Sequence, residues 1–83
     1  MPDPVSWMMI EQGWTVVDSA DDKVGTVQEV LGDVEADIFH GLVVLTGMLA
    51  TKEVLSEQVG EIVEGSVQLL VTKVEVDALG TGD

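Results

Sequence analysis

Cysteine and arginine are both absent from this chain of 83 residues, and lysine occurs only three times. Without cysteine the chain has no disulfide bonds, no thiolate metal sites and no cysteine nucleophile. Against the three lysines stand 16 aspartates and glutamates, which gives a formal net charge of -13. Because nucleic acids and anionic membranes are bound chiefly through Lys and Arg, we expect no nucleic-acid partner and no membrane attachment.

Long hydrophobic runs are absent as well. Residues 42–45 form one of the longest uninterrupted apolar segments and have only the length of a strand, whereas a membrane-spanning helix needs ~20 such residues. Residues 1–4 contain no basic segment, so a signal peptide is not expected and a cytoplasmic location is predicted. The chain is nevertheless 46% hydrophobic, which predicts a folded protein. We expect an N-terminal arm at 1–9, one domain at 10–79 and a disordered tail at 80–83.

Valine dominates the hydrophobic residues, and β-branched side chains favour strands. Val24, Val27 and Val30 are spaced by three, which would also permit a helix, but Gly25 and the β-branched neighbours favour a strand with a bulge. The segment 32–37 is predicted to be a polar connection. Strands are expected at 14–18, 24–31, 38–46, 51–55, 61–63 and 67–71.

Two short segments carry helix signals. Ser56 is expected to cap a helical turn at 56–59. In the segment 72–79, Thr72 and Glu75 have the spacing of a capping box, which favours a short helix, although alternating valines and acids would also suit a strand. The whole pattern predicts an all-β fold, a small β-barrel of five to six short strands with a short C-terminal helical turn. Four glycines are assigned to structural turns: Gly13, Gly25, Gly41 and Gly65.

The order of these residues resembles the PRC-barrel domain family. That family usually reads G-x-x-V-x-D-x-x-G-x-x-I/V-G-x-V-x-x-V through its first hairpin. The similar segments of this chain, which together extend over about residues 10–79, are 10–19, 23–27, Val30, 41–44, 54–59 and 71–75. Asp21 stands where the first hairpin of the family usually has glycine.

This resemblance implies a small barrel without an intrinsic cofactor. The family includes the cytoplasmic domain of the photosynthetic reaction centre H subunit and the C-terminal domain of a ribosome maturation factor, where it is a non-catalytic assembly module. We therefore expect a non-enzymatic protein of PRC-barrel type that acts through protein–protein contacts.

Few residues suggest chemistry. His40 is the only histidine and lies in a predicted strand, where a place at the rim or partly in the core is expected. Acidic residues gather at 33–37 and at Asp18, Asp21 and Asp22, and solvated turn carboxylates are the preferred interpretation of both groups. The alternative function is a small-ligand or divalent-metal-binding protein that uses the barrel mouth or these acidic turns. No catalytic, cofactor-binding or metal-ligating residue is assigned.

Large apolar residues precede the predicted barrel. They either cap an open end of the barrel or form an interface, because Met and Trp are enriched at interfaces. The predicted interface residues are Trp7, Met8, Met9, Ile10, Met48 and Leu49. A homo-oligomer with the dimer favoured is expected, and a basic protein is the further partner that the charge would attract.

Overall fold

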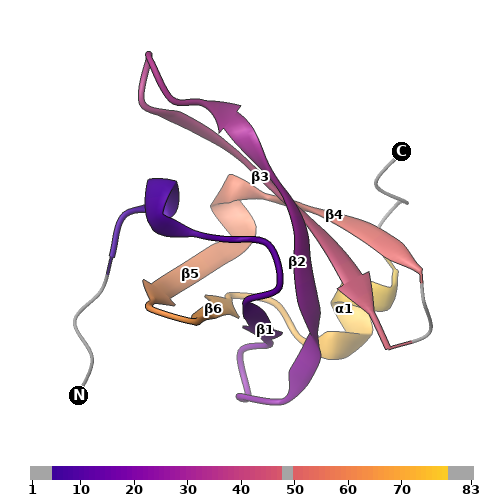
Figure 1. Cartoon of the computed structure of the whole chain (residues 1–83). Coiled ribbons are helices and arrows are strands. Elements are labelled where there is room, and N and C mark those ends of the chain that lie inside the picture. Colours follow the sequence, from indigo (N-terminus) through magenta and orange to yellow (C-terminus); the bar gives the residue numbers. More distant parts are fainter. Residues whose placement is uncertain (1–4, 48–49, 79–83) are drawn as a thin grey trace.

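The computed structural model describes residues 5–47 and 50–78, and its fold is all-β, as predicted (Figure 1). One short α-helix, α1, follows the strands, and two 3-10 turns, η1 and η2, lie before β1 and between β4 and β5. The predicted tail at 80–83 lies outside the described residues, as do Met48 and Leu49. The elements in chain order are η1 (Trp7–Met9), β1 (Thr15–Val17), β2 (Lys23–Asp33), β3 (Ile38–Thr46), β4 (Thr51–Leu55), η2 (Ser56–Gln58), β5 (Val59–Val63), β6 (Ser66–Leu69) and α1 (Lys73–Asp77).

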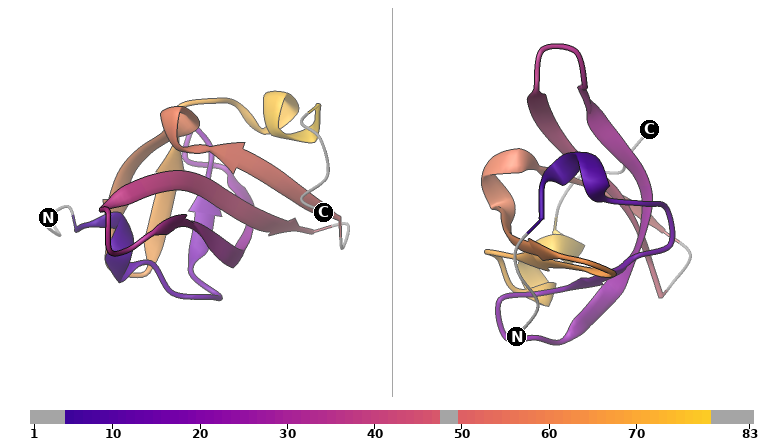
Figure 2. Two further views of the ribbon diagram at one scale, coloured as in Figure 1. Left: turned by 90° about the horizontal axis from the view of Figure 1, so that it is seen from above. Right: turned by 60° about the vertical axis from the view of Figure 1, so that its left-hand side comes forward.

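The six strands form one sheet in the order β4-β3-β2-β1-β6-β5. Neighbouring strands are antiparallel except β1 and β6, which run parallel and pair Thr15 with Ser66. The sheet is strongly curved, so its strands surround the hydrophobic core (Figure 2). The edge strands β4 and β5 are consecutive in the chain and joined by η2.

Strand β2 contains the predicted bulge. Val27 is opposite Val44 and Glu29 is opposite Val43, so Gln28 is an extra residue in the ladder. An extra residue reverses the alternation of side chains, and this allows Val27 and Val30 to pack on the same core despite their spacing of three. The strand also continues to Asp33, beyond the predicted end. The segment 32–37 was wrongly predicted to be entirely a connection, because Gly32 pairs with Phe39 and extends the β2–β3 hairpin.

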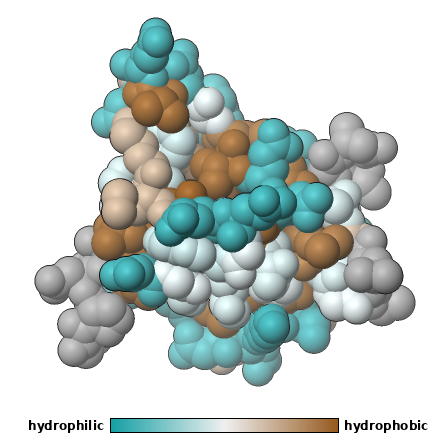
Figure 3. Space-filling view, in the orientation of Figure 1, coloured by the Kyte–Doolittle hydropathy of each residue, from teal (hydrophilic) through white to brown (hydrophobic). Residues whose placement is uncertain are grey.

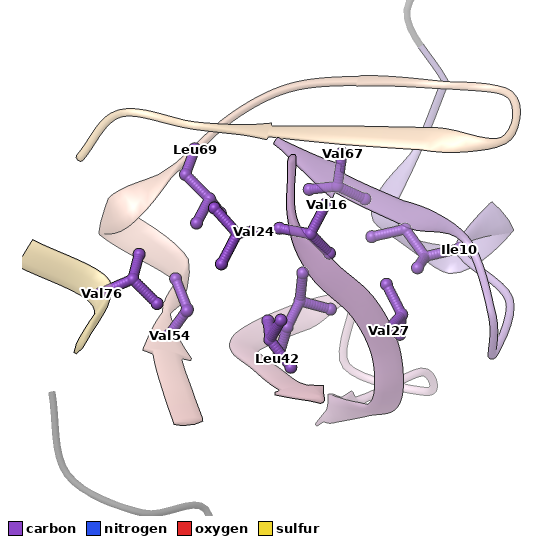
Figure 4. Close-up of a cluster of buried hydrophobic side chains, with 10 residues drawn as sticks. Ile10, Val16, Val24, Val27, Leu42, Val54, Val67, Leu69 and Val76 are labelled. Carbon is purple, nitrogen blue, oxygen red and sulfur yellow. The ribbon is translucent and has the colours of Figure 1, made fainter. Parts of the chain in front are cut away.

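Ten side chains from the strands, from α1 and from the segment after η1 form the core (Figure 4). Helix α1 is confirmed, and its capping box is present: the Glu75 N–H donates to Thr72 Oγ1 at 3.2 Å. The helix separates its two valines, since Val76 is fully buried while Val74 is 77% exposed. A strand would have placed both on one face. The core residues are Ile10, Val16, Val24, Val27, Leu42, Val44, Val54, Val67, Leu69 and Val76.

The four predicted turn glycines have two different roles. Gly13 and Gly65 have positive φ angles of 94° and 87° in turns, which suits glycine. Gly25 and Gly41 instead lie inside β2 and β3, where a Cβ atom would overlap the main-chain carbonyl of a neighbouring strand. Assigning these two to turns was wrong, because close strand packing is what requires glycine there.

The second 3-10 turn also differs in detail from the prediction. A helical turn is present at η2, but Leu55 and not Ser56 occupies its N-cap position. The Leu55 N–H donates to the side-chain oxygen of Gln58 at 3.0 Å.

Within the described residues, no helix is both long enough and apolar enough to cross a membrane.

Candidate functional site

The segment before β1 is held in place at several points. The Val5 N–H donates to the Ile62 carbonyl on β5 at 2.8 Å. Ser6 then begins η1, because its hydroxyl accepts from the Met8 N–H at 3.2 Å and its carbonyl accepts from the Met9 N–H at 2.9 Å. Ile10, directly after the turn, is buried in the core. The turn is therefore a fixed part of the domain.

Trp7 attaches η1 to the β2–β3 hairpin. Its ring stacks on Phe39 of β3, with ring centroids 5.3 Å apart and an interplanar angle of 14°. Its indole Nε1–H donates to Asp37 Oδ1 at 3.1 Å. The ring also lies close to Gly32, where a Cβ atom would be 2.6 Å from the Ile38 carbonyl oxygen and 2.9 Å from the Trp7 ring. The hairpin projects from the rest of the molecule, and η1 lies on one side of it (Figure 1 and the right view of Figure 2).

Met8 and Met9 remain exposed on this turn, by 42% and 58% respectively. We call these two side chains the methionine face. Val34, in the turn of the projecting hairpin, is 64% exposed and adds apolar surface near its tip. Apolar surface is visible along the side of the molecule that carries η1 (Figure 3). Ile38 is also exposed, but it alternates with Phe39 and so points to the other face of the hairpin.

The four predicted interface residues that the structure describes thus fall into two groups. Trp7 is partly buried and Ile10 is only 7% exposed, so both pack mainly within their own chain. Met8 and Met9 lie at the surface. Both interpretations of this segment therefore apply, to different side chains: Trp7 and Ile10 cap the core, while Met8 and Met9 remain open to a partner.

Carboxylates lie on the two segments next to η1, the chain that follows it and the hairpin tip that Trp7 contacts. Glu11 follows the turn closely, and Asp33, Glu35 and Asp37 occupy the neighbouring hairpin tip, all four with exposed side chains. Asp37 has a positive φ of 54° and accepts from the Trp7 indole. The Asp33 carboxylate accepts from the Ala36 N–H at 3.2 Å.

Asp18 differs from the other acidic residues because it is buried, with only 3% of its surface exposed. One carboxylate oxygen accepts from the N–H groups of Ala20 at 2.8 Å and Asp22 at 2.9 Å. The other accepts from the Lys73 N–H at 2.9 Å, at the start of α1. Treating Asp18 as a solvated turn carboxylate was wrong, because main-chain donors from two distant segments compensate its burial.

These contacts change the acidity of Asp18. The Asp22 N–H, together with the N–H groups of Lys73 and Ala20 and the positive charge of Lys73, holds the pKa of the Asp18 carboxyl below its ordinary value of 3.8. Burial acts in the opposite direction but is outweighed. The sequence did contain part of this signal, since an aspartate that begins a turn often accepts from N–H groups just after it.

The remaining polar candidates are dispersed. His40 is exposed on β3, which agrees with a place at the rim. Asp21 adopts a positive φ of 66° and accepts from the Gln68 side chain at 2.9 Å. Among residues 5–47 and 50–78, no three His, Asp or Glu side chains come together in a way that could hold a metal ion. Use of a barrel mouth for a small ligand stays a prediction.

Comparison with known proteins adds no assignment: the sequence matches no protein-family model, and no curated protein matches it significantly. The resemblance to PRC-barrel domains therefore stays a prediction from the residues quoted for it.

Proposed function

We propose that this chain is a non-catalytic binding module that acts through protein–protein contacts at the methionine face. The observation that carries the proposal is the exposure of Met8 and Met9 on a turn that Trp7 and Ile10 fix to the domain. Methionine is adaptable and enriched at protein interfaces. A fixed turn loses little conformational entropy when a partner binds, so its apolar area contributes efficiently to affinity.

The polar side chains support a binding role over a catalytic one. A buried carboxylate is a frequent catalytic group, but both oxygens of Asp18 already accept from main-chain N–H groups. These hydrogen bonds hold the β1–β2 turn to the start of α1. The resemblance to PRC-barrel domains favours the same kind of function, since that family serves as an assembly module. The cytoplasmic location stays part of this proposal.

The homodimer predicted from the sequence would use the same surface. A two-fold axis would place the methionine face of one subunit against that of its partner. Two subunits with a net charge of -13 repel each other, so association should strengthen as salt screens the charges.

The test is a pair of matched double substitutions. Met8→Asp with Met9→Asp places charge on the methionine face, whereas Leu70→Asp with Val74→Asp changes two apolar residues that are 64% and 77% exposed elsewhere. We expect the first variant to lose both self-association, measured by sizing with light scattering, and partners captured from the native lysate. The control should retain them. Capture that survives in the Met8/Met9 variant would place the contact surface elsewhere.

A further inference from the structure

We infer that the partner segment bound at the methionine face is basic and amphipathic: its apolar side chains contact Met8 and Met9, and its Lys or Arg side chains meet the surrounding carboxylates. This inference rests on the proposed function, because it specifies the chemistry of the partner. Four observations carry it: the exposed methionines, their fixed support, the carboxylates beside them, and the distant positions of the lysines.

The carboxylates come from two segments that Trp7 connects. Its indole bonds to Asp37 at the hairpin tip, and Met8 is the next residue in the chain. Glu11 lies just beyond the other end of η1. Exposed carboxylates therefore lie next to the methionine face along the chain, at Glu11, and on the hairpin tip to which Trp7 bonds, at Asp33, Glu35 and Asp37.

The three lysines lie away from this surface. Lys23 begins β2, at the opposite end of the strand from Asp33. The main-chain N–H of Lys73 bonds to Asp18, in the turn that precedes β2. Lys52 is opposite Val44, which in turn is opposite Val27, and Val27 is roughly 20 Å along the strand from Asp33. The field at the methionine face is consequently negative.

The exposed methionines and the carboxylates around them together favour one kind of occupant over the others. A second copy, as in the homodimer above, would bring its own carboxylates against these, so it is the weaker occupant and binds only where salt screens the like charges. A purely polar cation would leave Met8 and Met9 exposed to water. A segment with apolar residues on one face and basic residues beside them satisfies both features, as amphipathic segments do when they bind apolar surfaces.

The experiment uses the full chain and two synthetic peptides of equal positive charge. One is a Leu–Lys peptide with helical amphipathic spacing, and the other replaces each Leu by Ser. Calorimetry at ~0.15 M salt should give at least tenfold tighter binding for the Leu–Lys peptide. In ¹H–¹⁵N spectra, the Met8 and Met9 amides and the Trp7 indole should shift, whereas the amides of α1 should not.

Two pairs of variants separate the apolar and charged contributions. Met8→Gln with Met9→Gln should weaken binding of the Leu–Lys peptide about tenfold, while Leu70→Gln with Val74→Gln should leave it unchanged. Asp33→Asn with Glu35→Gln should weaken binding and reduce its salt dependence. The charge-matched control, Glu53→Gln with Glu57→Gln, alters exposed residues on β4 and η2 and should have a smaller effect.

Three results would overturn the inference. Equal binding of both peptides, unaffected by the methionine substitutions, would mean general attraction between opposite charges. Absence of peptide binding, with a wild-type dimer that Met8→Gln and Met9→Gln convert to monomers, would make a second copy the occupant and leave the proposed function standing. If neither peptide binds and the same substitutions alter neither assembly nor capture of partners, the proposed function fails as well.

Discussion

Two regions of this small domain use polar and apolar residues in opposite ways. In the first region the Asp18 carboxylate is buried, and both of its oxygens accept hydrogen bonds from main-chain N–H groups. At the methionine face, apolar side chains are exposed on a turn that the partly buried Trp7 and the buried Ile10 fix to the domain. The first region connects distant parts of the chain, while the second offers surface that the fold itself does not use. This difference separates residues needed for stability from those available for binding.

The largest effect is expected from removing the Asp18 carboxylate. Asp18→Ala leaves the N–H groups of Ala20, Asp22 and Lys73 without their acceptor, and unsatisfied buried donors are strongly destabilising. Asp18→Asn keeps one oxygen for the turn but presents an N–H₂ group to the Lys73 N–H. Melting temperatures should therefore fall in the order wild type, Asn variant, Ala variant. Equal melting temperatures for all three would contradict this role.

Acid should weaken the same region. The folded-state pKa of Asp18 is lowered, so the unfolded chain binds the proton more readily. The stabilisation is fully present above the unfolded pKa, near ~4, and is lost as pH falls through the lower folded value. Thermal melts from pH 6 to pH 2 should show a larger decline for wild type than for Asp18→Asn. Parallel declines would mean that other carboxylates dominate acid unfolding.

Trp7 should have the next largest effect, because it is partly buried and attaches η1 to the β2–β3 hairpin. Trp7→Ala removes a partly buried ring and its stacking on Phe39, for which we expect a loss of about 2 kcal/mol. Trp7→Phe keeps an aromatic ring and loses the bond to Asp37, for which about 0.5–1 kcal/mol is expected. Urea unfolding would measure both values. A neutral Trp7→Ala variant would mean that η1 does not need this attachment.

The net charge gives a smaller and more general effect. Salt screens the self-repulsion of a chain with a charge of -13, so the melting temperature should rise between low and roughly molar salt. Chloride and sulfate salts should be compared, since sulfate also strengthens apolar burial. A melting temperature that stays constant or falls with added chloride would contradict the expectation.

The smallest effect on stability is expected at the methionine face itself. Met8→Gln and Met9→Gln change exposed side chains, so each should alter the free energy of unfolding by no more than about 0.5 kcal/mol. Urea unfolding would again measure the change. A larger loss would show that the methionines support the fold, and the contrast with Asp18 would then disappear.

Local patterns predicted much of the fold. The strand at Ile38–Thr46 and the capping box of Thr72 and Glu75 depend on residues close together in the chain, and both are confirmed. The burial of Asp18 depends on Lys73, far along the chain, through a main-chain N–H that any residue other than proline would provide. Similarly, Gly32 is needed because the Ile38 carbonyl of β3 and the Trp7 ring both approach it closely. Composition contains no signal for contacts of this kind.

The parallel pairing of β1 with β6 affects how the chain must fold. Strand β1 lies between β2, which follows it at once, and β6, which is the last strand to be synthesised. The main-chain hydrogen bonds between β1 and β6 therefore cannot form on the ribosome until Ser66–Leu69 has left the exit tunnel. Pairing β1 with β6 first requires closure of a large loop, which costs conformational entropy before the stabilising contacts form. Folding should therefore be slow for a chain of this size. Until then, β1 is an unpaired edge of the β1–β2–β3–β4 meander that other nascent chains can reach.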